Sequence, residues 1–208
     1  MPHHLYRPEI STKPEGFVQN TDPLVFGSSF LYTNCKQRGQ GKLKHLAAGS
    51  IILFGSRVDR RFCLDTLFVV GSSQWYSPGL SPYPETLRQN SLIKEVTIEP
   101  ISRADIPRTL RAYSGCMYAL AETGPFSFIP CSTLTRHPNG FSRPTIELFD
   151  PRTNEDSIRH GMTQSYCGQV VGVERSRGIW SSIVNQVQAQ GLLLGVSFCE
   201  PTPPEGHS

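Results

Sequence analysis

The sequence predicts an α+β protein built on a curled or closed, mostly antiparallel β-sheet with a few helices at its margin. Glycine and proline are abundant, with 18 and 17 residues among 208, whereas only 18% of the residues are charged. Short apolar and aromatic segments alternate with clusters of these turn formers, which is typical of a loop-rich sheet protein. The hydrophobic fraction of 38% provides a sizeable core for one domain.

Three regions differ in composition along the chain. Residues 1–23 are polar and contain four prolines, so we expect an extended arm laid over the surface. Residues 24–199 hold the apolar segments and are expected to form a single globular domain. The tail at 200–208, EPTPPEGHS, is expected to be disordered.

The clearest local signal is a β-hairpin, which follows a segment of strand composition at 24–32. Two apolar runs, at residues 51–54 and 62–70, are joined by a charged connection at residues 55–61. The connection contains Asp59, Arg60 and Arg61, which suit an exposed turn. We therefore expect two adjacent antiparallel strands with a charged tip.

The rest of the domain is predicted to contain short strands, a Pro-rich loop and one long helix. Strands are expected at 92–98, 113–121, 126–130, 169–173 and 192–198, and residues 146–149 form a short apolar segment. Ser102 can cap a short helix over 102–111, which Pro107 limits. Apolar residues at helical spacing predict an amphipathic helix that ends at Gly191: Ile179, Trp180, Ile183, Val184 and Val187.

Charge and motif content limit the class of function. The formal net charge of +3 permits a polyanionic partner without requiring one. No signature of a phosphate-binding loop, a zinc site or a protease is present. The first residues, MPHHLYRPEI, lack the apolar run of a signal peptide, and no stretch reaches the roughly 18 apolar residues of a membrane span. We therefore expect a cytoplasmic protein without a membrane partner, whose six scattered cysteines are free thiols.

Asp65 is the first candidate for a functional side chain, because it lies in the middle of the predicted strand 62–70. A carboxylate between apolar neighbours is costly unless it is paired, and aspartate is disfavoured in strands. Alternation places Cys63, Asp65 and Leu67 on one face. If that face lines a groove, Asp65 can accept a hydrogen bond from a ligand amine or act as a general base. The alternative is a structural ion pair with Arg57, Arg60 or Arg61.

The segment YTNCKQR at residues 32–38 carries side chains suited to a nucleotide. An aromatic ring can stack on a base, side-chain amides can read its polar edge, and cations can contact phosphate. Tyr32 would stack on the base, and Asn34 and Gln37 would read its edge. Lys36 and Arg38 would contact phosphate. Cys35 beside Lys36 can have a lowered pKa and act as a nucleophile, or it is an inert thiol at a strand end.

A basic loop continues this segment through Lys42, Lys44 and His45, and it is a possible phosphate contact. Glycines at Gly39 and Gly41 allow the backbone to approach a phosphate closely. The alternative is a solvated loop without a ligand.

A second group of polar side chains lies at residues 160–168, HGMTQSYCG. His160 and Cys167 flank a loop that can fold back over a pocket, where Tyr166 would contact the ligand. His160 can form a thiol–imidazole pair with Cys35 or a carboxylate–imidazole pair with Asp65. A mixed Cys/His metal site is a further alternative, although the usual spacing of zinc ligands is missing.

The loop at 71–84, GSSQWYSPGLSPYP, combines turn formers with Trp75, Tyr76 and Tyr83. Such a loop is either the lip of a binding site or a stapled part of the surface. In the first case Trp75 contacts the ligand.

Two resemblances narrow the ligand class. The region LAAGSIILFGS…FCLDTLFVV resembles a recurring element of PUA-like barrels of the ASCH and EVE types, in which the neighbouring groove accepts a base or nucleotide. Together with FLYTNCKQ and PFSFIPC, it is similar to the nucleotide modification associated domain, type three, family of bacteria and phages. This resemblance implies a nucleotide or nucleic acid as the substrate class and assigns no catalytic residue.

Three hypotheses of function follow, none of which names a cofactor. The first is binding and modification of a nucleotide or nucleic-acid base in a groove beside the 51–70 hairpin, with Asp65, Cys35 and His160 as catalytic residues. The second is a small-molecule metalloenzyme or thiol enzyme that uses the same three side chains and Cys167. The third is a non-catalytic interaction module that uses the loop around Trp75.

Overall fold

The structure, a computed structural model, describes much of the predicted domain: residues 22–26, 29–34, 37, 41–59, 61–98, 109–118, 121, 124–132, 143–147, 149–150, 155–156 and 173–198. The expected arm at 1–23 lies outside these residues up to residue 21, the expected strand at 169–173 up to residue 172, and the expected tail at 200–208 entirely. So does the expected helix up to residue 108.

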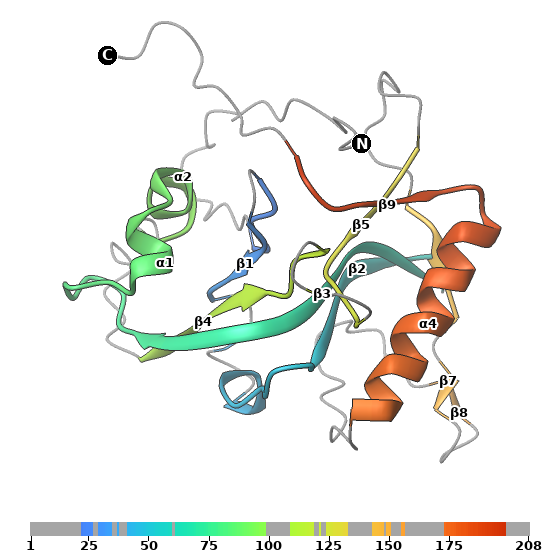
Figure 1. Cartoon of the computed structure of the whole chain (residues 1–208), viewed down its shortest axis with the longest axis horizontal. Coiled ribbons are helices and arrows are strands. Elements are labelled where there is room, and N and C mark those ends of the chain that lie inside the picture. Colours follow the sequence, from blue (N-terminus) through green and yellow to red (C-terminus); the bar gives the residue numbers. More distant parts are fainter. Residues whose placement is uncertain are drawn as a thin grey trace, which may run out of the picture.

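A long central strand organises the main sheet (Figure 1). β3 (Arg61–Tyr76) pairs along one edge with β2 (Ile51–Val58), and along the other with β6 (Thr145–Ile146) and β4 (Leu110–Gly115). β1 (Leu31–Tyr32) pairs with β4 on its far side. All of these pairs are antiparallel, so the predicted α+β class with a mostly antiparallel sheet is confirmed.

A β-bulge at Asp65 explains how a strand accommodates an aspartate. Thr66 pairs with Phe54, and Leu64 pairs with Gly55. Asp65 is therefore an extra residue that has no partner in the register with β2. A bulged residue leaves the regular ladder and bends the strand. The predicted hairpin is confirmed, and its tip lies at Asp59, whose φ is 49°.

The bulge also reverses the alternation of side chains. The sequence predicted that Leu67 shares a face with Asp65 and Cys63, opposite to Leu64. In the structure Leu64 and Leu67 belong to the same buried cluster, so that prediction is wrong. The extra residue shifts the period of two by one position.

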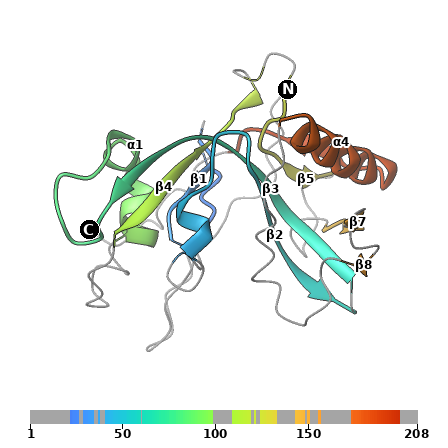
Figure 2. The same cartoon turned by 90° about the horizontal axis from the view of Figure 1, so that it is seen from below.

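A second bulge carries β3 beyond its predicted end. The register shifts between Val70 and Ser72, which leaves Gly71 as the extra residue opposite β4. The strand then continues to Tyr76, through residues that were predicted to form a loop. Figure 2 shows the result: β3 arches, with β2 beside one half and β4 and β1 beside the other.

Helix α4 (Val173–Ala189) confirms the predicted amphipathic helix. Its apolar face buries Ile183, Val184 and Val187, and the chain leaves it through Gly191, whose φ of 74° suits the end of a helix. Two glutamines one turn apart tie α4 to the edge of β6. The Gln190 side-chain amide bonds both backbone groups of Thr145, at 3.0 and 3.2 Å, and the Gln186 amide does the same at Glu147.

The remaining elements are short. They are η1 (Gly41–Lys44), α1 (Glu85–Arg88), α2 (Ser91–Ile93), η2 (Lys94–Ile98), β5 (Ile129–Cys131), β7 (Phe149–Asp150), β8 (Glu155–Asp156) and β9 (Leu193–Gly195). β5 pairs with β9, and β7 pairs with β8. The expected strand at 92–98 is therefore wrong, because α2 and η2 are helical; the Asn90 side chain accepts a hydrogen bond from the Ile93 N–H at 2.9 Å and starts this turn.

Three buried clusters form the core. One lies between the main sheet and α4, and a second lies under α1, α2 and η2. The third is aromatic and contains Phe30, Tyr32, Phe68, Tyr113 and Phe198. It joins β1, β3 and β4.

The sheet is curled but the strands that the structure describes do not close into a barrel. β1 and β2 end the strand order, and they meet only through side chains: the rings of Tyr32 and Phe54 lie 5.4 Å apart. Among the helices in the described parts of the chain, none is both long and apolar enough to cross a membrane.

Candidate nucleic-acid interface

Tyr32 belongs to the core and not to a binding surface. Its side chain is 1% exposed, and its ring stacks on Tyr113 with a centroid distance of 5.6 Å. The rings of Phe54 and Phe68 close its remaining sides. The structure thus corrects the prediction that Tyr32 stacks on a ligand, because no face of the ring is open.

Gln37 holds the backbone together instead of reading a base. Its Nε2 donates to the carbonyl oxygens of Thr33 and Arg111, at 3.0 and 2.6 Å, and its Oε1 accepts from the Arg111 N–H at 2.8 Å. The side chain is fully buried. Its amide takes the place of a further strand residue beside β4, where β1 has already ended. The predicted reading role is therefore corrected.

Asp22, which the sequence analysis did not single out, also fixes the backbone of this segment. Asp22 accepts hydrogen bonds from the Thr33 N–H and hydroxyl, at 3.2 and 3.0 Å, and from the Asn34 N–H at 2.6 Å. The Tyr76 hydroxyl donates to the Thr33 carbonyl at 3.1 Å. The segment that leads into Cys35 is thus fixed from several sides. Asn34 itself is half-buried, and its reading role stays a prediction.

Asp65 forms a surface ion pair with Arg143. The guanidinium donates Nε to Oδ1 and Nη2 to Oδ2, the second at 3.0 Å, and the side chains are 35% and 45% exposed for Arg143 and Asp65. An ion pair was one alternative that the sequence offered, and this partner comes from the chain just before β6. Two of the partners that the sequence named, Arg60 and the side chain of Arg57, lie outside the described part of the chain. Because Tyr32 is enclosed in the core, the structure does not bring Asp65 and Tyr32 into one cavity.

The other predicted catalytic and ligand-binding residues lie outside the described part of the chain: Cys35, Lys36, Arg38, His160, Tyr166 and Cys167. Within the described part, no group of three His, Cys, Asp or Glu side chains is placed to hold a metal ion. Cys63, Cys116 and Cys131 are free thiols. Burial raises the pKa of Cys116 and Cys131, which disfavours the nucleophilic thiolate at neutral pH.

Trp75 is a predicted ligand-binding residue that the structure leaves accessible. It lies near the end of β3, opposite Arg111 of β4, and 46% of it is exposed. The Arg111 guanidinium lies over its ring at 4.6 Å from the centroid, and the His45 ring meets it edge-on at 5.8 Å. We call Trp75, Arg111 and His45, with Lys42 and Lys44 of η1, the Trp75 surface.

Arg111 is held in this position by a neighbour on the same face. Its Nε and Nη2 both donate to the Ser73 hydroxyl, at 3.0 and 2.8 Å. A guanidinium fixed over an aromatic ring keeps its charge and its remaining N–H groups for a ligand. The Arg111 guanidinium is thus oriented before any ligand binds.

Tyr113 fixes the basic segment to the sheet. Its hydroxyl donates to the Leu43 carbonyl at 2.8 Å and accepts from the Leu46 N–H at 3.1 Å. Burial raises the pKa of Tyr113, although the Leu46 bond and the Arg111 charge act in the opposite direction. The hydroxyl therefore stays protonated and keeps η1, with Lys42 and Lys44, beside Trp75.

Sequence reasoning missed both Arg111 and Tyr113 as site residues. It assigned Arg111 to a helix over 102–111 and began the next strand at Tyr113, whereas β4 contains both residues. A signal was present in LRAYSG, where an arginine and a tyrosine two positions apart share one face of a strand. The pairing of Arg111 with Trp75, in contrast, depends on contacts far apart in the sequence.

Comparison with models of protein families, with curated proteins and with solved structures found no match.

Proposed function

We propose that the protein binds single-stranded nucleic acid on the Trp75 surface. The observation that supports this most directly is the exposed Trp75 ring, with the Arg111 guanidinium of β4 over it and the His45 ring at its edge, directly after the two lysines of η1. Proteins that bind single strands combine aromatic side chains, on which bases stack, with positive charges that follow the phosphates. Trp75 and Arg111 supply both components in direct contact with each other.

The chemistry of this surface favours a single strand over a duplex. A tryptophan ring offers a flat apolar face to an unpaired base, whereas the bases of a duplex already stack on each other. Lys42 and Lys44 can neutralise phosphates, which makes the expected affinity dependent on salt. Stacking does not distinguish the bases strongly, so we expect little sequence preference.

This ligand class agrees with the resemblance to the nucleotide modification associated domain, type three, family and to PUA-like barrels. The proposed location differs from the groove beside the hairpin that the sequence suggested, because Tyr32 and Gln37 are buried there. A base-modifying reaction needs a reactive group, and Cys35 and His160 lie outside the described residues. Modification therefore stays a prediction from sequence.

Replacing Trp75 by alanine is expected to weaken binding of a fluorescein-labelled octathymidylate about tenfold or more. The reason is that stacking of one base on an aromatic ring contributes about 1–3 kcal/mol. Fluorescence anisotropy at fixed salt measures the change. Tyr118→Ala is the matched control, because Tyr118 is also an exposed aromatic residue, at 61%, but lies outside the Trp75 surface.

A second variant separates this proposal from the sequence hypothesis. Asp65→Asn removes the carboxylate of the surface ion pair and is expected to leave the affinity unchanged. Loss of binding in Asp65→Asn, with Trp75→Ala binding like the wild type, would return the site to the hairpin groove.

A further inference from the structure

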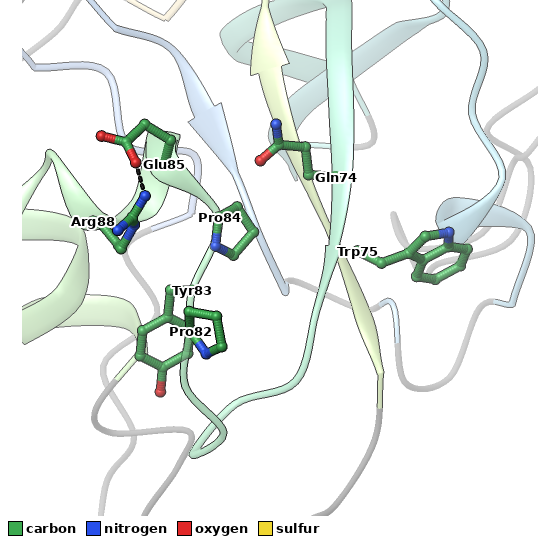
Figure 3. A pocket seen from close by; sticks show the side chains of 7 residues that line it. All are labelled: Gln74, Trp75, Pro82, Tyr83, Pro84, Glu85 and Arg88. Carbon is green, nitrogen blue, oxygen red and sulfur yellow. Dashed lines mark ion pairs between the residues drawn. The ribbon is translucent and has the colours of Figure 1, made fainter.

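A groove lies on the other side of β3 from the Trp75 ring. It is open to solvent, its volume is about 560 Å³, and its lining residues are Gln74, Trp75, Pro82, Tyr83, Pro84, Glu85 and Arg88. Figure 3 shows the Trp75 ring pointing away from the other six side chains. Trp75 thus belongs to both the Trp75 surface and the wall of the groove.

The groove contains an ordered aromatic side chain. The Tyr83 hydroxyl accepts a hydrogen bond from the Gly79 N–H at 2.9 Å, and its ring packs edge-on against the buried Tyr76 at 6.5 Å. The two contacts fix Tyr83 at both ends. Pro82 and Pro84 flank it and offer rigid apolar surface. A planar ring can therefore bind here without first ordering the site.

Polar groups of the groove match a nucleotide. Gln74 is exposed on the same side of β3 as Arg88 and Glu85, and an amide can bond donor and acceptor groups of a base edge (Figure 3). Arg88 and Glu85 form an exposed ion pair, and pairs of this kind are weak. A phosphate can therefore replace the Glu85 carboxylate at the Arg88 guanidinium.

We infer that this groove is a second base subsite, so that the ligand is a single strand of at least two nucleotides that crosses the end of β3. This inference rests on the proposed function, because the Trp75 ring binds the first base. Continuity supports it: Gln74 and Trp75 are neighbours in the strand and present side chains to the groove and to the Trp75 surface. The groove then sets the length of strand that the protein recognises.

Binding of thymidine monophosphate, dithymidylate and octathymidylate tests the inference. Wild-type affinity is expected to rise steeply from the monophosphate to the octamer. Tyr83→Ala should weaken octamer binding roughly tenfold and leave monophosphate binding on Trp75 unchanged. Circular dichroism melting checks that this variant folds, and Leu80→Ala, which removes an exposed side chain of the same loop, is the matched control.

Charge gives a second test that does not depend on the packing of Tyr83. Arg88→Gln should weaken octamer binding, and Glu85→Gln should strengthen it, each by a few fold. If the wild type binds the octamer and Trp75→Ala abolishes this, while the three groove variants bind normally, the second subsite is refuted and the proposed function stands. If the wild type binds none of the three probes, both are refuted.

Discussion

Replacing Gln37 by leucine is expected to lower the free energy of unfolding by about 3 kcal/mol. Leucine fills a similar volume but removes the amide that bonds the Arg111 N–H and carbonyl at 2.8 and 2.6 Å. Buried backbone groups left without a partner cost about 1–3 kcal/mol each. Urea unfolding followed by circular dichroism measures the loss.

The control for this variant is Gln89→Leu, because Gln89 is an exposed glutamine whose amide bonds only the exposed Glu85 carboxylate among the bonds the structure describes. Its substitution should change the free energy of unfolding by less than about 0.5 kcal/mol. Equal effects of the two substitutions would show that the Gln37 amide does not hold β4. Some other contact would then have to keep Arg111 in its place over the Trp75 ring.

Gly55→Ala is expected to destabilise the protein by a similar amount, about 3 kcal/mol. A Cβ at this position would lie 2.2 Å from the Cys63 carbonyl oxygen and 2.6 Å from the Phe62 ring. Gly55 lies beside the bulge of β3, and the backbone oxygen opposite it is fixed in the ladder. The strands must therefore separate to accept even one methyl group, and thermal unfolding will report the loss.

Gly178→Ala provides the opposite sign in the same experiment. Gly178 is an exposed residue inside α4, and a Cβ there meets no atom within 4 Å. Alanine in a helix is more stable than glycine by about 0.5–1 kcal/mol, so this variant should melt at a higher temperature. A stabilising Gly55→Ala would contradict the register of the hairpin.

The elements that the sequence predicted are those whose signals are local. The hairpin at 51–70 and helix α4 are specified by a charged turn and by helical spacing within a few residues. The end of β3 was missed because Gly71, Ser72 and Ser73 have the composition of a turn, whereas in the structure Gly71 is a bulge in a continuing strand. The expected strand at 92–98 is wrong because its alternating residues follow an N-cap at Asn90, which starts a helical turn.

The candidate site could be predicted in its chemistry but not in its location. In the sequence, Tyr32, Gln37 and Asp65 each offer an aromatic or polar group that could contact a ligand. Only long-range contacts show that Gln37 bonds Arg111 and that Asp65 pairs with Arg143. Trp75 was predicted to lie in a loop, whereas it is an exposed residue of β3, and its partner Arg111 lies 36 positions away across a strand pair that was not predicted.

Fluorescence of Trp75 during binding tests the central proposal most directly. The chain has two tryptophans, so Trp180→Phe leaves Trp75 as the sole indole. Because a base stacked on the ring should quench its emission, we expect octathymidylate to quench this variant saturably and less strongly at higher salt. Binding that saturates in anisotropy without any change in Trp75 emission would contradict the proposal, as would the absence of binding.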